Sequence, residues 1–191
     1  MTKTFYDKVA KKFGGFSYGI NNPIYTSECS DGDPEKIFKE KLLKLVTNNK
    51  VALDVGCGDC RFAFNIAEHF HKIIGIDNSR ELLNVAKIKQ KTLNVKNVSF
   101  LFQDASKTTF KDESFDIIYC RRGPSFFKEY YRLLKKGGYY LEIGIGGKDA
   151  MELKKVFGRG QGYEKMNTPR LLKDKNELKK AGYKIVFAKD Y

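Results

Sequence analysis

The chain has 191 residues, 41% of them hydrophobic, and carries 36 Lys and Arg against 23 Asp and Glu, a formal net charge of +13. That length is enough for one domain with a full sheet-and-helix core. The sequence contains no apolar run long enough to cross a membrane, and its start, MTKTFYDKVAKK, lacks the apolar centre of a signal peptide. We therefore expect a soluble, cytoplasmic protein that is not exported.

The positive charge is concentrated in the last third of the chain. Residues 1–50 carry a net charge of +3, residues 51–120 carry 0, and residues 121–191 carry +10. This distribution favours an anionic partner, either RNA or a phosphorylated or carboxylated small molecule. A solvated lysine-rich surface is the other explanation, since 29 of the 36 basic residues are Lys.

The first fifty residues predict two helices joined by a loop. Residues 2–13 place aromatic and aliphatic side chains on one helical face, with lysines opposite. Residues 14–32 have the Gly, Asn, Ser and Pro content of a long loop. Its aromatic side chains, Tyr18 among them, suit either a lid over a flat ligand or attachment to the core. Asp33 and Pro34 mark the start of a second, amphipathic helix.

The segment VALDVGCGDCRF, residues 51–62, predicts a buried strand that ends at an acid and two glycines. Asp54 is costly to bury there unless it meets hydrogen-bond donors such as backbone amides or a ligand's amine. Gly56 and Gly58 are spaced for a tight turn in which a ligand can lie against the backbone. We expect the next helix to begin near residue 59 or 60. The pattern indicates a pocket for a nucleotide-type cofactor.

A second strand with an acid at its end follows. Residues 72–76, KIIGI, are apolar and lead to Asp77, about twenty residues after the glycine turn, as expected for an acid that binds a ribose. Asn78 and Ser79 can cap a helix over residues 80–91. The remaining sequence predicts a strand at 98–102 before Asp104, a strand at 115–120, a helix, Gly137-Gly138 turn and fifth strand over 129–144, a last helix at 171–181 and a sixth strand at 183–188.

Arg121 and Arg122 come directly after the fourth predicted strand, at the edge where open parallel sheets bind ligands. Because Arg can hold a carboxylate or phosphate with two hydrogen bonds, we expect at least one of them to face the substrate or a carboxylate of the cofactor. Pairing with acids on a neighbouring helix is the alternative. Together with Tyr18, these two residues are the candidates for a catalytic role.

The four cysteines, Cys29, Cys57, Cys60 and Cys120, offer no disulfide framework, which fits a reducing compartment. Cys57 and Cys60 form a C-x-x-C pair, but the nearby His69 and His71 do not have the spacing of a closed zinc site. We therefore expect no metal.

The sequence D-x-G-x-G at the first strand, followed by acids at the next two strand ends, resembles class I S-adenosylmethionine-dependent methyltransferases over about residues 50–146. The resemblance implies an α/β fold, with a doubly wound, mostly parallel sheet and helices on both faces. It also implies that Asp54 orients the loop and the cofactor's methionine amine, that Asp77 accepts from the ribose, and that Asp104 accepts from the adenine. The implied cofactor-binding set is Asp54, Gly56, Cys57, Gly58, Asp77, Asn78, Asp104, Ala105 and Cys120.

Two features depart from that family. Cys60 stands where members often have a third small residue, and we expect the sheet to lack the usual seventh strand. The organisation that follows is one methyltransferase domain over residues 1–191. It comprises an N-terminal helix, lid loop and packing helix at 1–48, a cofactor-binding core at 49–146, and a basic substrate-side segment at 147–191.

The favoured function is methyl transfer from S-adenosylmethionine to a small acceptor, and the charge favours an anionic one. An RNA acceptor and a non-catalytic cofactor-binding module are the alternatives. A dehydrogenase is the remaining competitor, but Arg61 stands where its G-x-G-x-x-G motif needs a third glycine. The acceptor atom and the oligomeric state stay open, because fold analogy does not supply them.

Overall fold

The computed structural model describes residues 3–15, 32–146, 149, 151–158 and 169–190. Contacts within the chain define two compact units, Met1–Ile143 and Gly144–Tyr191. The elements are α1 (Lys3–Phe13), α2 (Pro34–Lys44), β1 (Val51–Val55), α3 (Arg61–Ile66), a 3-10 turn (Ala67–His69), β2 (Lys72–Asp77), α4 (Arg80–Leu93), β3 (Val98–Phe102), β4 (Phe115–Arg121), α5 (Phe127–Leu133), β5 (Leu134–Ile143), α6 (Met151–Phe157) and α7 (Arg170–Lys180).

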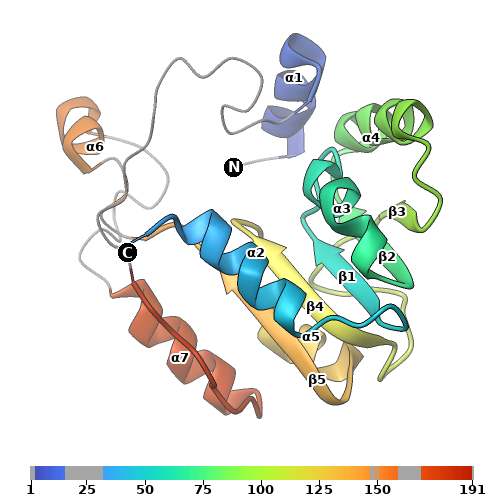
Figure 1. The fold of residues 1–191 in the computed structure, drawn as a ribbon. Helices are drawn as coiled ribbons and strands as arrows, with labels where there is room; N and C mark the ends of the chain where they lie inside the picture. Colours follow the sequence, from blue (N-terminus) through green and yellow to red (C-terminus); the bar gives the residue numbers. More distant parts are fainter. Residues whose placement is uncertain (1–2, 16–31, 147–148, 150, 159–168, 191) are drawn as a thin grey trace. The chain divides into compact units, whose positions relative to one another are not determined.

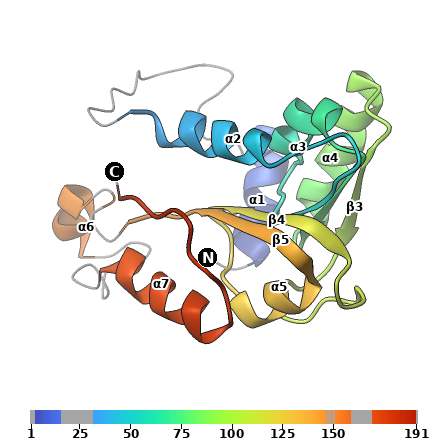
Figure 2. The same ribbon diagram turned by 60° about the horizontal axis from the view of Figure 1, so that its bottom comes forward.

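The first unit is built on a five-stranded, fully parallel sheet in the order β3-β2-β1-β4-β5. Helices α2, α3 and α4 lie on one face of this sheet and α5 lies on the other (Figures 1 and 2). The expected α/β fold with helices on both faces is therefore confirmed. From β1 the chain first adds β2 and β3 on one side of the sheet and then returns to add β4 and β5 on the other side. Open sheets of this kind bind ligands beyond the carboxyl ends of the strands, at the point between β1 and β4 where the order switches sides.

The central strands are buried on both faces, as their near-continuous apolar sequences require. On the face covered by α2 and α3, the core contains Leu42, Ala52, Ile73 and Ile117, all 0% exposed. Because successive side chains of a strand point to opposite faces of the sheet, the residues next to these in each strand face the other side. A strand end that emerges from such a core is held rigidly, so the residues that follow β1, β2 and β4 have well-defined positions.

Local sequence signals fix where the helices begin. The Asp33 carboxylate accepts a hydrogen bond from the Glu35 backbone at 2.9 Å, and Pro34 occupies the first turn of α2, as predicted. Ser79 caps α4 by accepting from the Leu82 backbone at 3.2 Å. The helix predicted to begin near residue 59 or 60 begins at Arg61, because Cys60 adopts a left-handed conformation with φ of 55°.

Two parts of the sequence-based prediction need correction. Residues 183–190 form no strand, so the predicted sixth strand at 183–188 is wrong; their apolar side chains Val186 and Phe187 are 74% and 49% exposed. The aromatic face predicted for the first helix is only partly buried. Ala10 is covered, whereas Phe5 and Phe13 are 40% and 70% exposed. In both cases the apolar pattern is present, but a large part of its side-chain surface stays exposed.

The second unit contains α6 and α7. Arg170, at the start of α7, forms an ion pair with Asp174 at 3.0 Å and donates to the Ile145 carbonyl at 2.9 Å. The ammonium of Lys154 in α6 is buried and lies 3.5 Å from the Asp149 carboxylate. The sequence did not predict α6. None of the helices in the described part of the chain is long and apolar enough to cross a membrane.

Candidate cofactor site

The glycine loop leaves the end of β1 and is held against β2. Gly56 and Gly58 have φ of 68° and 56°, values that favour glycine. The backbone amides of Gly56 and Cys57 both donate to the Ile76 carbonyl, at 2.9 and 3.1 Å. The loop is therefore fixed by backbone hydrogen bonds, and a Cβ atom on Gly56 would lie 3.4 Å from Pro124, so the loop packs closely against the residues that follow β4.

The buried Asp59 anchors the far end of the same loop. Its carboxylate forms an ion pair with Lys89 of α4 and another with Arg61 at 3.3 Å. Because both cations come from helices that pack on the sheet, they hold the turn between the glycines and α3. The sequence did not indicate this role for Asp59.

Asp77 lies at the end of β2 and faces the loop. One carboxylate oxygen accepts from the Gly58 amide at 2.9 Å and the other accepts from the Ser79 amide at 2.8 Å. Burial raises the pKa of Asp77, and these backbone hydrogen bonds partly oppose the increase. Each carboxylate oxygen can accept more than one hydrogen bond, so Asp77 keeps acceptor capacity for a ligand. The exposed Asn78 follows it directly.

Asp54 is the deepest acid of the site. It sits in β1 and is only 4% exposed. Burial raises its pKa to about 7; Arg121 and the Tyr119 hydroxyl lower it, while the nearby Asp77 raises it further. Asp54 and Asp77 lie in adjacent parallel strands, β1 and β2, each toward the carboxyl end of its strand. A buried carboxylate of this kind is stabilised by a cationic ligand group.

Helix α1 packs along α4 beside these acids. The Ser79 hydroxyl donates to the Asp7 carboxylate at 2.6 Å, and Lys11 pairs with Glu81 at 3.4 Å. This position brings the Tyr6 hydroxyl close to Asp77, and burial together with the charge of Asp77 raises the pKa of Tyr6. The N-terminal helix is therefore attached at the rim of the site, although Asp7 carried no recognisable signal in the sequence.

Arg121 and Arg122 at the end of β4 both bind one acid of α2. Arg121 donates to Glu35 at 2.7 and 3.2 Å and stacks over Phe62 with its guanidinium carbon 4.1 Å from the ring centre. Arg122 forms an ion pair with the other oxygen of Glu35 and has φ of 57°. The predicted alternative, pairing with an acid of a neighbouring helix, is thus confirmed. Two guanidinium groups therefore share one carboxylate, and the charge of Arg121 also acts on the buried Asp54.

The other predicted residues are less closely grouped. Asp104 follows β3 at the same edge of the sheet, but it is exposed and accepts from the Ser106 amide at 2.8 Å; this hydrogen bond lowers its pKa. Ala105 is buried beside it. Cys120 is fully buried, with its sulfur 3.5 Å from the Pro124 carbonyl oxygen. Tyr18 lies outside the described residues.

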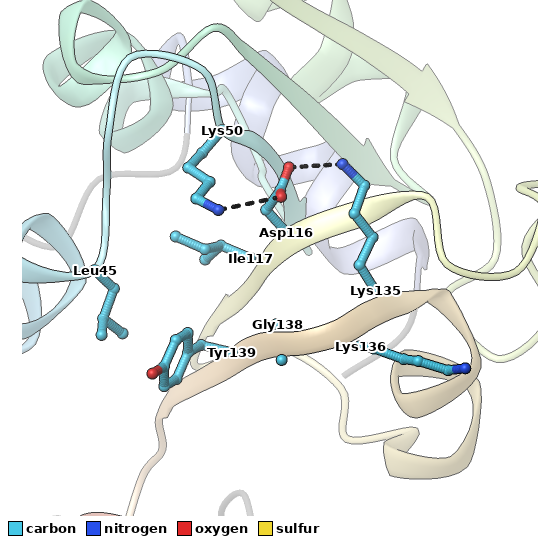
Figure 3. A pocket seen from close by; sticks show the side chains of 9 residues that line it. Leu45, Lys50, Asp116, Ile117, Lys135, Lys136, Gly138 and Tyr139 are labelled. Atoms are coloured by element: carbon cyan, nitrogen blue, oxygen red, sulfur yellow. Dashed lines mark hydrogen bonds and ion pairs between the residues drawn. The ribbon is translucent and has the colours of Figure 1, made fainter.

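A small pocket of about 100 Å³ lies at the opposite end of the sheet. Figure 3 shows Lys50 and Lys135 directed at Asp116, whose carboxylate they contact at 3.4 and 2.9 Å. Although burial opposes it, hydrogen bonds from the Val51 amide and Lys135 hold the pKa of Asp116 below its ordinary value. This pocket is lined by Leu45 and Lys50, which precede β1, and by the amino-terminal parts of β4 and β5, so it is separate from the site around Asp54 and Asp77.

Position 75, in the middle of β2, has room only for glycine because side chains of the glycine loop lie directly against it. A Cβ atom at this position would lie 2.8 Å from the Cys57 sulfur and 2.9 Å from the Cys57 Cβ atom. We expect Gly75→Ala to lower the free energy of unfolding by about 2 kcal/mol, because the Cys57 Cβ atom cannot rotate away. Urea denaturation measures the change. Gly146→Ala is the control, since the nearest atom to a Cβ there is 4.0 Å away; equal effects of the two variants would contradict the prediction.

The parallel sheet, the glycine loop and the acids at the ends of β1 and β2 define the class I, Rossmann-like methyltransferase fold. The sequence profile of a family described as "Methyltransferase domain" matches residues 46–186, and the chain belongs to this family. The family expected from the sequence is thereby confirmed.

Individual relatives agree with this assignment. A demethylmenaquinone methyltransferase of Lactococcus lactis is 30% identical over 152 residues, which cover 72% of this chain and 58% of that protein. Phosphoethanolamine N-methyltransferase 3 of Arabidopsis thaliana is 35% identical over 109 residues, 52% of this chain and 22% of that protein. The crystal structure of a putative methyltransferase from Bacillus halodurans superposes with a TM-score of 0.57 at 27% identity, covering 73% of this chain and 68% of that one. The chain spans less than two thirds of the length of these two curated relatives.

Proposed function

We propose that this chain binds S-adenosylmethionine at the ends of β1 and β2 and transfers its methyl group to a small acceptor that carries an anionic group. The observation that supports this best is the buried Asp54, with the half-buried Asp77 at the end of the adjacent strand, beside the glycine loop. A carboxylate that is 4% exposed and has a pKa of about 7 is costly to keep unless a cationic ligand group neutralises it.

The residues of the site fit this cofactor. Asp54 has the charge and burial to meet the methionine amine, and Asp77 has free acceptor capacity for the ribose hydroxyls. The backbone at Gly56, Cys57 and Gly58 allows close approach. Asn78, Asp104, Ala105 and Cys120 complete the proposed binding set around the ribose, the adenine and the methionine chain. When bound, the cofactor supplies an activated methyl group, so the protein contributes mainly orientation and exclusion of water.

The acceptor class follows from charge. Arg121 and Arg122 both contact the Glu35 carboxylate at the end of β4, and a guanidinium group can bind the carboxylate or phosphate of an acceptor in the same way. The names of two relatives, demethylmenaquinone methyltransferase and phosphoethanolamine N-methyltransferase, refer to small-molecule acceptors, and the second of these carries a phosphate. We also propose a cytoplasmic location, since Cys57, Cys60 and Cys120 are free thiols.

We expect Arg121→Ala and Arg122→Ala each to weaken binding about tenfold, because each removes a charge-assisted hydrogen-bond donor. The dissociation constant that rises is that of the ligand whose anionic group the arginine binds, either the cofactor or the acceptor. Calorimetric titration with S-adenosylhomocysteine and with 5′-methylthioadenosine, which lacks the amino-acid part, shows whether the arginines bind the carboxylate of the cofactor. Weaker binding of S-adenosylhomocysteine alone assigns the arginines to the cofactor carboxylate, whereas a higher KM for the acceptor assigns them to the substrate. Lys128→Ala removes one exposed positive charge as a control. Unchanged constants in both arginine variants would exclude the role.

The function itself is tested by transfer of a labelled methyl group from S-adenosylmethionine to pools of small carboxylates, small phosphates and RNA. We expect product from the small anionic pool. The net charge of +10 over residues 121–191 favours RNA as a second candidate. Labelled RNA, with binding that weakens steeply as salt rises, would support that acceptor instead. Binding of the cofactor without transfer to any pool would contradict the proposed activity.

A further inference from the structure

The sulfur atoms of Cys57 and Cys60 lie together under the glycine loop. A Cβ atom placed on Gly75 would be 2.8 Å from the Cys57 sulfur and 3.2 Å from the Cys60 sulfur, so both sulfurs converge on the same point above β2. A glycine in the middle of a buried strand often marks such a close approach. The Cys60 thiol is also among the groups that raise the pKa of Cys57, after the larger effect of burial.

The backbone between the two cysteines has a geometry compatible with a disulfide. The Cys60 amide donates to the Cys57 carbonyl at 2.9 Å, which closes a four-residue turn and keeps their Cα atoms within the span that a disulfide bridges. Cys60 keeps a φ of 55°, a conformation in which glycine is the favoured residue. Cys60 therefore has a side chain at a position whose backbone conformation favours glycine.

We propose that Cys57 and Cys60 form a reversible disulfide that switches off cofactor binding at the glycine loop. The effect on binding rests on the function proposed above, whereas formation of the disulfide does not. Cys57 is partly exposed and Cys60 is fully buried. Both sulfurs lie under the loop, and Cys57 is the less buried of the two residues, so we assign Cys57 as the residue that meets the oxidant and Cys60 as the residue that resolves the intermediate.

A peroxide is sufficient as the oxidant. The Cys57 thiolate attacks one oxygen of hydrogen peroxide, the O–O bond breaks, and sulfenic acid and hydroxide form. The Cys60 sulfur then attacks the Cys57 sulfur, the S–O bond breaks, and the second hydroxide leaves; the protons of the two thiols convert both hydroxides to water. Burial, the Cys60 thiol and the carboxylates of Asp54 and Asp77 raise the pKa of Cys57, so the reaction is slow at neutral pH.

The disulfide opposes cofactor binding because it changes the loop that carries the binding groups. A sulfur–sulfur bond of about 2 Å requires the two side chains to approach from non-bonded contact. The segment between them includes Gly58, whose amide donates to Asp77 at 2.9 Å. A shift of about 1 Å in such a loop is enough to lose a large part of a positioned interaction. Reciprocally, bound ligand should slow formation of the disulfide.

The experiment compares the full chain after treatment with hydrogen peroxide and after reduction. Peptide mapping by mass spectrometry under non-reducing conditions locates the disulfide, and calorimetry measures the affinity for S-adenosylhomocysteine. We expect a Cys57–Cys60 disulfide, an affinity at least tenfold lower, full recovery on reduction, and slower oxidation when the ligand is present. Cys60→Gly should bind the ligand and lose the response to peroxide, while Cys29→Ser should keep it.

Three outcomes would overturn the inference. The first is a disulfide that maps to other cysteines, the second is an oxidised pair with unchanged affinity, and the third is a peroxide response that persists in Cys60→Gly. Failure of the proposed function is distinguishable from these, because the reduced chain would then bind no S-adenosylhomocysteine while the mapping would still report whether the disulfide forms.

Discussion

Asp77→Asn is expected to weaken binding of S-adenosylhomocysteine about 100-fold, the largest loss of affinity for a single side chain of the site. The carboxylate offers the ribose hydroxyls charged acceptors, and each such hydrogen bond contributes about 1.5–3 kcal/mol, where 1.4 kcal/mol is about tenfold in affinity. Asparagine keeps the shape of the side chain but loses the charge. Calorimetric titration of both proteins measures the change.

Asp77 also accepts hydrogen bonds from the Gly58 and Ser79 amides, so Asp77→Asn could weaken binding simply by loosening the loop. A second measurement must therefore report on the ribose hydroxyls alone. The 2′-deoxy analogue of S-adenosylhomocysteine supplies it. The unmodified protein should discriminate against the analogue, and Asp77→Asn should not. Glu68→Gln, which changes an exposed acid away from the site, is the control. Equal discrimination by both proteins would remove Asp77 from the ribose site.

Asp54→Asn is expected to stabilise the fold at high pH and to weaken cofactor binding. The pKa of Asp54 is raised from 3.8 to about 7 in the folded chain. Its contribution to stability is therefore fully present below about pH 4 and decreases as the pH rises toward 7, because the unfolded chain releases the proton first. Asparagine has no proton to lose. Its stability advantage over the unmodified protein should be larger near pH 8 than near pH 4.5 by about 3 kcal/mol.

Urea denaturation of both proteins at the two pH values measures this difference. The same variant should bind S-adenosylhomocysteine at least tenfold more weakly, because the amine of the ligand loses its counter-charge. In the unmodified protein the affinity should rise between pH 6 and pH 8 as Asp54 ionises. A stability difference that does not depend on pH, together with unchanged affinity, would show that Asp54 serves the fold alone.

Sequence patterns predicted the core of the first unit well. The strand at Val98–Phe102 was predicted with its observed bounds, and the strand that contains Asp54 and the one that leads to Asp77 were placed to within one residue. These segments are short, apolar and bounded by turn residues, so the pattern and the tertiary structure demand the same conformation. The location of Asp54 and Asp77 at one edge of the sheet followed from topology, since parallel strands present their carboxyl ends at one edge.

Long-range polar contacts could not be predicted. Nothing in the sequence near Glu35 indicates that it binds Arg121 and Arg122, which follow some 86 residues later, because the contact depends on how α2 crosses the sheet. The same holds for the hydrogen bond between Ser79 and Asp7. The predicted strand at 183–188 failed for a related reason. Its apolar alternation suits a strand, but a strand also needs a partner edge, which a local pattern does not specify.

The most direct test of the central claim is a crystal structure of the reduced chain with S-adenosylhomocysteine. We expect the ligand beyond the carboxyl ends of β1 and β2, with its amine near Asp54, its ribose hydroxyls on Asp77 and its methionine chain against Gly56 and Gly58. Ligand bound elsewhere, such as the lysine pocket at Asp116, with Asp54 and Asp77 making no contact to it, would contradict the account.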